Sequence, residues 1–359
     1  MFLNPFYHSF GMDIGDRSIK LVQLQRVRCG VFKYCHRLTH FSQIPLPIGW
    51  IVDGELQKPE EIVQALKNHI AKQKDGLAIS PWVAISLPET KTYIQLIQLK
   101  TNGEQISEEI VREVAPSYLP YELDDIYLDW QIIEQNANHA SVLLAAVPKK
   151  IADSYTYLLN IAGLTPLAME VEATAITRAI INRQKDLTRE ARGILDLGAS
   201  RSSFVIYDHG VIQFSLSLAF AGQEVTEKIS NALNLDLAEA EKIKKECGID
   251  PKKCKGNLKS VLENSLNDLA DKITQAIQFY KLHFPEKNPL TGIRLCGGGA
   301  NLPARENYLS AKLKLKIRKA NPWVNLFPTN QPPMTEERSL LYATAIGLAI
   351  RADESPIKF

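Results

Sequence analysis

Long hydrophobic segments are absent from this sequence, and so is a strong charge of either sign. No run of 18 apolar residues occurs, and residues 1–10 are too short and too uncharged for a signal peptide, so we expect no direct membrane insertion. The 42 basic side chains are balanced by 40 acidic ones, a net charge of +2, which gives no overall electrostatic reason to expect a nucleic-acid partner.

Cysteines are also few. The five, Cys29, Cys35, Cys247, Cys254 and Cys296, are odd in number and lack C-x-x-C spacing, which indicates neither a disulfide framework nor a zinc site and favours a cytosolic protein. With 359 residues the chain exceeds the size at which single cores stop growing, so we expect two domains.

An internal repeat is the most informative feature that the sequence does contain. The segment Met12–Leu21 returns as Leu195–Phe204, with Asp-x-Gly at Asp13–Gly15 and at Asp196–Gly198. Each copy predicts a strand, a tight turn and a second strand. Glycine leaves the backbone amides open to an anion, and the aspartate can face a nucleotide-bound cation. One copy alone is better explained as an Asx turn, but two copies with matching flanks favour two facing phosphate loops.

The segments between and after the repeats have their own patterns. Residues 91–162 predict a self-contained β-α-β-β-α unit, and residues 167–182 predict a helix that leads into the second loop. Further along, the strand Ile293–Cys296 runs into Gly297–Gly299, and a helix over residues 303–311 follows. A glycine-rich turn between strand and helix lets a ligand approach the backbone near a helix N-terminus.

Together, the two Asp-x-Gly loops and Gly297–Gly299 resemble the phosphate-1, phosphate-2 and adenosine motifs of the actin, hexokinase and chaperone ATPase superfamily. The resemblance implies an α/β, duplicated actin-like (ribonuclease H-like) ATPase fold with two domains around a nucleotide cleft. Domain I covers residues 1–184, with a small β-α-β-β-α subdomain inserted at about 90–165; domain II covers 185–350, and 351–359 form a C-terminal tail. The implied cofactors are ATP and magnesium.

Site residues follow from the same resemblance. Magnesium binds few carboxylates and keeps several waters, so Asp13 and Asp196 are its expected ligands, mainly through water. Glu172 lies in a segment similar to the connecting-helix motif of MreB-type actins and is the candidate for positioning an attacking water. The implied phosphate contacts are Asp13, Gly15, Arg17, Ser18, Lys20, Asp196, Gly198, Ala199, Ser200 and Arg201, and the implied adenosine contacts are Glu241, Lys244, Gly297, Gly298, Gly299 and Asn301.

Plain structural roles are the alternatives for several of these residues. From the residues alone, the alternatives are a solvated strand lysine for Lys20 and a helix-surface glutamate for Glu172. Glu241 and Lys244 are equally an exposed ion pair one turn apart, worth about 0.2–0.5 kcal/mol.

The inserted unit narrows the family. Residues 109–130 resemble the corresponding segment of the PilM family, the cytoplasmic actin-like proteins of the type IV pilus assembly platform, and similar stretches extend over nearly the whole chain. The resemblance implies an FtsA-like fold and a location peripheral to the inner membrane. Its implied partners are other pilus platform proteins and a PilN-type bitopic membrane protein, whose N-terminal peptide occupies a groove of domain I. The candidate peptide contacts are Arg112, Tyr118, Tyr121 and Trp130; for Trp130, a place in the core is an equal alternative.

Two positions depart from the family's phosphate loops. Asp16 stands where small hydroxylated residues usually follow the glycine, so an acid lies close to the expected phosphates. Arg201 replaces a small residue in the second loop, where it adds a charge-assisted phosphate contact. We expect the two changes to offset each other.

The leading hypothesis is an ATP-binding scaffold with slow or absent hydrolysis, in which nucleotide sets the angle between the domains and thereby the state of the peptide groove. A sugar or small-molecule kinase is the first alternative. It lacks a convincing substrate base, because Asp53 and Asp208 lie in contexts typical of turns or surfaces. An FtsA-like filament-forming protein is the second alternative, although residues 351–359 contain no long basic amphipathic helix.

Overall fold

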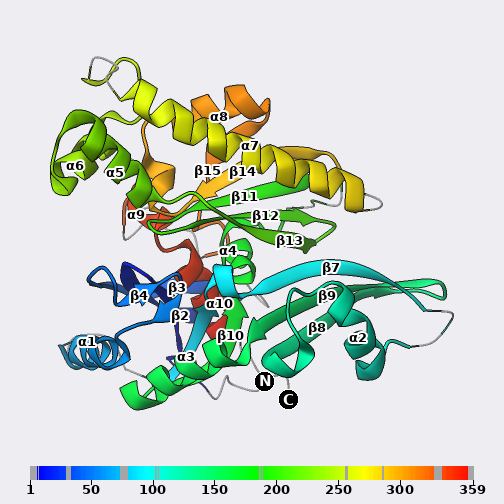
Figure 1. The fold of residues 1–359 in the computed structure, drawn as a ribbon. Helices are drawn as coiled ribbons and strands as arrows, with labels where there is room; N and C mark the ends of the chain where they lie inside the picture. The colour runs from blue at the N-terminus through cyan, green and yellow to red at the C-terminus, as the bar shows by residue number, and fades with distance from the viewer. Residues whose placement is uncertain are drawn as a thin grey trace.

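Two β-sheets with helices around them make up the protein, and the computed structural model shows one above the other in the view of Figure 1. The structure describes all residues except 1–5, 7, 30–33, 73–79, 102, 104, 186, 188, 255–257, 285–286, 327–333 and 355–359. A short ribbon of β4 (Ile51–Val52) and β5 (Glu55–Leu56) stands apart from both sheets. Within these described residues, none of the helices has the length and apolar character needed to cross a membrane.

The first sheet contains the first copy of the repeat. Its strand order is β10-β6-β1-β2-β3. The first three strands in the sequence are antiparallel neighbours, β1 (Phe10–Gly15), β2 (Ser18–Arg28) and β3 (Tyr34–Pro45). The next two extend the sheet in parallel, β6 (Trp82–Leu87) beside β1 and β10 (Thr165–Val171) beside β6. Two helices, α1 (Pro59–Lys72) and α3 (Lys149–Ala162), share its core.

The second sheet repeats this plan. Its order is β15-β14-β11-β12-β13-β7-β9-β8. Three strands are antiparallel neighbours, β11 (Ala191–Leu197), β12 (Ser202–Asp208) and β13 (Val211–Leu218), and two more add in parallel, β14 (Leu290–Cys296) and β15 (Lys316–Lys319). In both sheets the loop aspartate lies opposite the residue seven positions later, Asp13 opposite Lys20 and Asp196 opposite Ser203. The duplicated α/β fold is therefore confirmed.

Helices cover the second sheet. In Figure 1, α7 and α8 lie above it and α5 and α6 stand at one end. Along α7 the apolar residues at helical spacing face the core, since Leu262, Leu266, Leu269 and Ile273 are all buried. The bounds are α5 (Gly222–Leu233), α6 (Leu237–Cys247), α7 (Lys259–His283), α8 (Arg305–Leu313) and α9 (Glu336–Leu340).

The elements of the predicted β-α-β-β-α unit are present, but the unit is not self-contained. Strands β7 (Tyr93–Lys100), β9 (His139–Pro148) and β8 (Ile126–Gln135) extend the second sheet, joined to it by one residue pair, Gln95 opposite Phe214. Their own core contains α2 (Glu108–Val114), whereas α3 packs into the core of the first sheet. The sequence pattern predicted this last helix of the unit but not the surface that it covers.

The helix predicted over residues 167–182 is wrong in its first part. Residues Thr165–Val171 pair with β6 as strand β10, and the helix α4 is confined to Glu172–Ile180. Pairing with a buried parallel strand overrides the local helical pattern. As a result, Glu172 is the first helical residue after the carboxyl end of a parallel strand, a place where α/β folds commonly bind ligands.

Two helices cross between the sheets, α4 and α10 (Ala343–Asp353). Although α10 follows the second sheet in the chain, it packs on β1, β2 and β6. The contacts are backbone against backbone. A Cβ on Gly347 would lie 1.8 Å from the Ala175 carbonyl oxygen, and one on Gly11 would lie 2.3 Å from the Ala349 nitrogen. Only residues without bulky side chains fit at this crossing.

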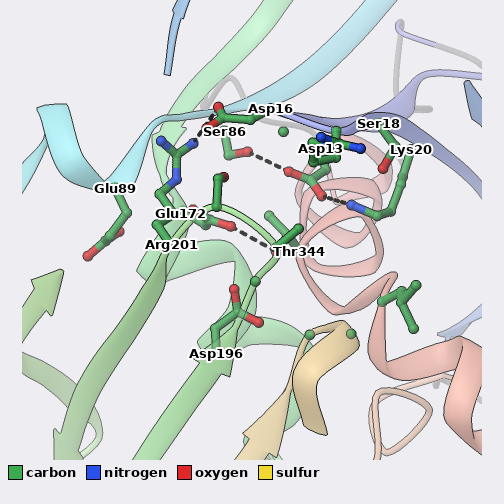
Figure 2. A pocket seen from close by; sticks show the side chains of 18 of the residues that line it. Asp13, Asp16, Ser18, Lys20, Ser86, Glu89, Glu172, Asp196, Arg201 and Thr344 are labelled. Carbon is green, nitrogen blue, oxygen red and sulfur yellow. Dashed lines mark hydrogen bonds and ion pairs between the residues drawn. The ribbon is translucent and has the colours of Figure 1, made fainter. Parts of the chain in front are cut away.

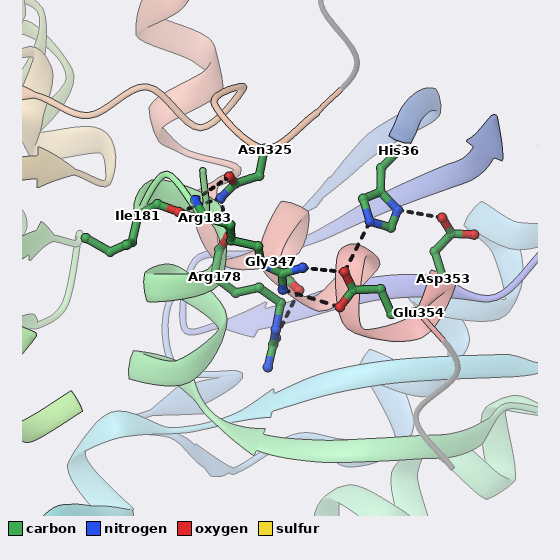
Figure 3. A network of polar contacts seen from close by, with 8 residues as sticks. All are labelled: His36, Arg178, Ile181, Arg183, Asn325, Gly347, Asp353 and Glu354. Carbon is green, nitrogen blue, oxygen red and sulfur yellow. Dashed lines mark hydrogen bonds and ion pairs between the residues drawn. The ribbon is translucent and has the colours of Figure 1, made fainter. Parts of the chain in front are cut away.

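A polar network joins the carboxyl-terminal ends of the two crossing helices (Figure 3). His36, on β3, lies 2.6 Å from Asp353 and 3.3 Å from Glu354, both at the end of α10. Glu354 also pairs with Arg183, which follows α4. Asn325 donates hydrogen bonds to the final carbonyl groups of α4, including that of Ile181 at 2.6 Å. The network thus ties β3, α10 and α4 together.

This network gives an expected pH dependence of stability. Burial lowers the pKa of His36, but hydrogen bonds to Asp353 and Glu354 outweigh it and raise the pKa to about 9. Since the folded pKa lies above the unfolded value of about 6.5, the stabilisation is full below pH 6.5 and is lost as the pH rises through 9. We expect the unfolding free energy of the native protein to fall by up to about 3 kcal/mol over that window relative to His36→Asn. Urea unfolding of both proteins at several pH values measures this, and parallel curves would contradict it.

The cysteines differ from the expectation. Cys29 pairs with Cys35 across the strands β2 and β3, and Cys247 pairs with Cys254, with Cα–Cα distances of 5.9 and 5.7 Å. Cys296 is buried and free. The hairpin and the end of α6 bring together cysteines whose spacing shows no motif. Cysteine usage therefore gives no argument for a reducing compartment.

Candidate functional site

The first Asp-x-Gly loop forms a tight turn between β1 and β2. Asp13 is buried, its Oδ2 accepts a hydrogen bond from Lys20 Nζ at 2.9 Å, and its Oδ1 accepts one from Ser86 Oγ at 3.5 Å. Burial lowers the pKa of Lys20, but the Asp13 carboxylate outweighs it and the pKa is raised. Lys20 therefore remains a cation directed at the loop and is not a solvated strand lysine.

The second loop is closed by backbone bonds. The amide of Gly198 donates to the Arg201 carbonyl at 2.9 Å, and the amides of Gly222 and Gln223, at the start of α5, donate to the carbonyls of Gly198 and Ala199. A Cβ on Gly198 would lie 2.4 Å from the Arg201 carbonyl oxygen. The glycine of this motif is therefore required by the close approach of backbone.

Both loops line one cavity of about 260 Å³ between the sheets (Figure 2). The adenosine motif reaches the same cavity through Gly297 and Gly298. All the predicted phosphate contacts lie on its wall: Asp13, Gly15, Arg17, Ser18, Lys20, Asp196, Gly198, Ala199, Ser200 and Arg201. The structure thus brings together residues almost two hundred positions apart in the chain.

Acids crowd the floor of this cavity. Glu172, at the start of α4, accepts a hydrogen bond from Thr344 Oγ1 at 3.4 Å. Burial, together with Asp13 and Asp196, raises the pKa of Glu172 well above its usual range, and burial raises the pKa of Asp196 as well. Glu172 is therefore not a helix-surface glutamate, and a bound cation would relieve the repulsion among these carboxyl groups.

Three residues of this cavity carried no signal in the sequence. Ser86 and Glu89 come from the end of β6 and the short helix η1 (Glu89–Lys91), and Thr344 comes from α10. Glu89 is 6% exposed, and its Oε1 accepts a hydrogen bond from Ser215 Oγ of β13. Burial raises the pKa of Glu89. Lone residues at strand ends give no recognisable spacing.

Some of the predicted adenosine contacts line the cavity and others lie outside it. Gly297 has φ +76°, and a Cβ there would lie 2.4 Å from Asp196 Oδ1, so this glycine lets the adenosine motif touch the second phosphate loop. Gly299 packs its backbone against Arg305, which donates to its carbonyl. Asn301 Nδ2 donates to the Glu337 carbonyl at 2.8 Å. Neither Gly299 nor Asn301 lines the cavity.

Glu241 and Lys244 lie on α6, outside the lining of the cavity. Lys244 Nζ is 2.6 Å from Glu241 Oε2, and it also donates to the Gly222 carbonyl at 2.7 Å and to Thr226 Oγ1 at 2.6 Å. The pair is thus more than an exposed ion pair, because it fastens α6 to the start of α5 and so supports the second loop from behind.

Known proteins of similar sequence and structure share this architecture. The family described as type IV pilus assembly protein PilM matches residues 11–353. The chain belongs to the PilM family. A solved PilM–PilN type IV pilus biogenesis complex is similar with a TM-score of 0.80 and 22% identity, covering 97% of this chain and 99% of that chain. MreB 5 of Spiroplasma citri bound to AMPPNP is similar with a TM-score of 0.56 and 14% identity, covering 96% and 95%.

A cell division protein is similar to this chain in sequence. Cell division protein FtsA of Buchnera aphidicola subsp. Acyrthosiphon pisum (strain APS) is 26% identical over an alignment of 190 residues that covers 46% of this chain and 44% of FtsA. The match therefore spans less than half of that relative. The PilM family membership and the actin-like fold are shown, as the sequence indicated.

The partner residues implied by the PilM resemblance lie on the extension of the second sheet. Tyr118 is 37% exposed, after α2. Arg112 is exposed and pairs with Glu108 at 2.7 Å on the same helix. Tyr121 and Trp130 pack in part against the core of the extension. The Trp130 side chain packs against this core and is only half-buried, so part of it remains accessible to a partner.

The cavity suits a magnesium ion that is held by few carboxyl groups and keeps most of its waters. Among the described residues, no group of three or more His, Cys, Asp or Glu is close enough to hold a metal ion. Asp13 and Asp196 line the same cavity from its two loops, and burial, with the neighbouring Asp13, raises the pKa of Asp196. Two carboxylates and several waters are the coordination that magnesium prefers.

Asp53 and Asp208 differ from their expected settings. Asp53 is in the turn between β4 and β5 as predicted, with φ +50°, but it faces Arg201 of the cavity at 3.9 Å. Asp208 is fully buried, where Tyr280 Oη and the Asn288 amide donate to its Oδ2. It is a structural anchor of the β12–β13 turn, not a surface residue.

Proposed function

We propose that the protein is an ATP-binding, cytoplasmic scaffold of the type IV pilus inner-membrane assembly platform. The observation that supports it most is the single cavity lined by Asp13 and Asp196 from the two loops and by Gly297 and Gly298 from the adenosine motif. Such convergence of backbone amides, one lysine and two carboxylates suits a magnesium-bound polyphosphate. Solved MreB 5 of the same fold carries AMPPNP.

Each residue then has a role in holding the nucleotide. Lys20 supplies positive charge to the phosphates, and the amides of the two loops donate to their oxygens. Asp13 and Asp196 hold magnesium through water, and the ion offsets the phosphate charge. Glu172 is assigned to orient water, but burial, Asp13 and Asp196 raise its pKa, and a protonated carboxyl group accepts no proton. Hydrolysis is therefore slow or absent.

We assign the two domains to residues 1–184 and 185–350, hinged at α4 and α10. The partner is a PilN-type membrane protein whose N-terminal peptide binds a groove of domain I, on the part of it whose strands extend the second sheet. The peptide contacts there are Arg112, Tyr118, Tyr121 and Trp130. The relative with a TM-score of 0.80 was solved as a PilM–PilN complex. Association with the inner membrane then comes through the partner, beside other platform proteins.

Calorimetric titration with magnesium ATP, followed by a steady-state assay of phosphate release with and without a PilN-type peptide, tests the proposal. We expect saturable ATP binding and turnover well below the typical 1–1000 per second of enzymes. Rapid phosphoryl transfer to a metabolite would instead make the protein a small-molecule kinase.

The partner surface has its own test in Tyr118→Ala. We expect the substitution to weaken binding of a PilN-type peptide by about 1–4 kcal/mol, because exposed aromatic anchors dominate peptide interfaces. Tyr34→Ala is the matched control, since Tyr34 on β3 is 38% exposed against 37% for Tyr118. Fluorescence anisotropy of a labelled peptide measures both. Full affinity in a folded Tyr118→Ala protein would remove this residue from the site.

A further inference from the structure

Arg201 reaches across the cavity from the second loop to the first domain. Its Nη2 lies 3.7 Å from Asp16 Oδ1, and its Nη1 lies 3.9 Å from Asp53 Oδ1 and 3.4 Å from Thr90 Oγ1. The arginine side chain is 15% exposed and that of Asp16 is 4% exposed. A guanidinium so poorly hydrated requires anionic partners, and here the opposite loop supplies the most buried one.

The acidic half of this contact is held rigidly. Asp16 Oδ1 accepts a hydrogen bond from the Gly54 amide at 3.2 Å, and the Gly54 carbonyl accepts one from the buried Tyr155 Oη at 2.9 Å. Asp16 is therefore fixed to the first domain, through a residue of α3. Arg201 belongs to the second loop. The helix α5 next to that loop makes a further contact across the cavity, in which Arg17 Nη1 donates a hydrogen bond to Gln223 Oε1 at 3.2 Å.

We propose that Asp16 and Arg201 form a charge clasp that holds the nucleotide-free cleft closed, and that a polyphosphate competes with Asp16 for Arg201. A carboxylate and a phosphate present the same paired oxygens to a guanidinium, and both loops line the cavity in which the phosphates are proposed to lie. The closing role rests on the contacts of Arg201 with Asp16 and of Arg17 with Gln223 across the cavity. The competition rests on the proposed ATP function.

The clasp makes nucleotide affinity adjustable. A ligand that needs a conformation populated only part of the time binds more weakly by that fraction. Each opening of the clasp exposes Arg201 to the phosphates, while Asp16 stays behind as a repelling charge. The same pair therefore favours low occupancy in the resting state and a larger structural change on binding, compared with loops that carry small residues at both positions.

Hydrogen–deuterium exchange of the nucleotide-free protein tests the closing role. Asp16→Asn removes the charge but keeps an oxygen for the Gly54 amide, and Arg201→Gln removes the guanidinium. Each variant is read in the opposite loop: residues 198–203 for Asp16→Asn, and residues 13–18 for Arg201→Gln. We expect exchange there to be about fivefold faster or more, and no faster still in the double variant. Asp268→Asn, an exposed acid on α7, makes the same charge change away from the cleft and is expected to alter neither loop.

If hydrogen–deuterium exchange became faster only in the loop that carries the substitution, the proposed clasp would be wrong. The competition is measured separately, by calorimetry with magnesium ATP. We expect Asp16→Asn to bind about tenfold more tightly than the native protein, and Arg201→Gln to bind more weakly. Equal affinities of Asp16→Asn and the native protein would overturn the competition. Absence of ATP binding by the native protein would contradict the proposed function, while the exchange data would still decide the clasp.

Discussion

Asp196→Ala is expected to weaken magnesium ATP binding by about 100-fold and to leave the protein folded. Asp196 is one of the two carboxylates that face the proposed magnesium ion, and nothing on the opposite loop replaces it. Its pKa is raised, first by burial, so the folded protein holds this charge at a cost. Removing the carboxyl group therefore does not lower the thermal midpoint.

Calorimetric titration distinguishes a magnesium ligand from a general defect. The loss is expected with magnesium ATP and largely absent with ATP in the presence of a chelator, because only the metal contact has been removed. Asp268→Ala, on the exposed side of α7, is the matched control and is expected to bind as the native protein does. Equal magnesium ATP affinity of Asp196→Ala and the control would refute the assigned cleft.

Gly347→Ala is expected to destabilise the fold by more than about 3 kcal/mol. The added methyl group would lie 1.8 Å from the Ala175 carbonyl oxygen and 2.5 Å from its carbonyl carbon. Both are backbone atoms, so no side chain can move aside and the helices α4 and α10 must separate. In an exposed helix the same change would instead stabilise by up to about 1 kcal/mol. The sign of the effect thus reports the packing.

Gly298→Ala provides the comparison. The nearest atom to a Cβ at this position is Leu341 Cγ at 3.9 Å, an ordinary contact distance. We expect this variant to unfold in urea near the native midpoint, whereas Gly347→Ala unfolds far below it or does not accumulate as folded protein. Similar midpoints for the two would show that α4 and α10 are packed less tightly than the structure indicates.

Features encoded within a few neighbouring residues were predictable from the sequence. The Asp-x-Gly loops and Gly297–Gly299 depend on local backbone requirements, and the duplication of the Asp-x-Gly loops indicated the fold. Glu172 was identified by resemblance, but the sequence pattern placed it inside a longer helix. Strand β10 takes its form from pairing with β6, and no local signal competes with such a long-range contact.

Contacts between distant segments were beyond the sequence. Glu89, Ser86 and Thr344 reach the cavity from three separate elements, with no spacing that links them. Likewise, Asp16 and Arg201 were each recognised as unusual and expected to offset each other, but only the structure places them 3.7 Å apart. The sequence shows only that the two charges have opposite sign, whereas the structure shows that the two loops face each other and bring these charges into contact.

The single residue pair that joins β7 to β13 has a mechanical consequence. Strand β7 starts from η1, part of the wall of the cleft, and is followed by α2, β8 and β9. Its ladder pairing with β13 is the pair of Gln95 and Phe214, beside which Ile94 and Leu96 pack into the core of the second sheet. A rotation of the first sheet against the second would be concentrated at this junction, because the ladder between β7 and β13 is much shorter than the ladders on either side of it. A small angular change at the cleft thereby becomes a larger sweep at the tip, as at the end of a lever.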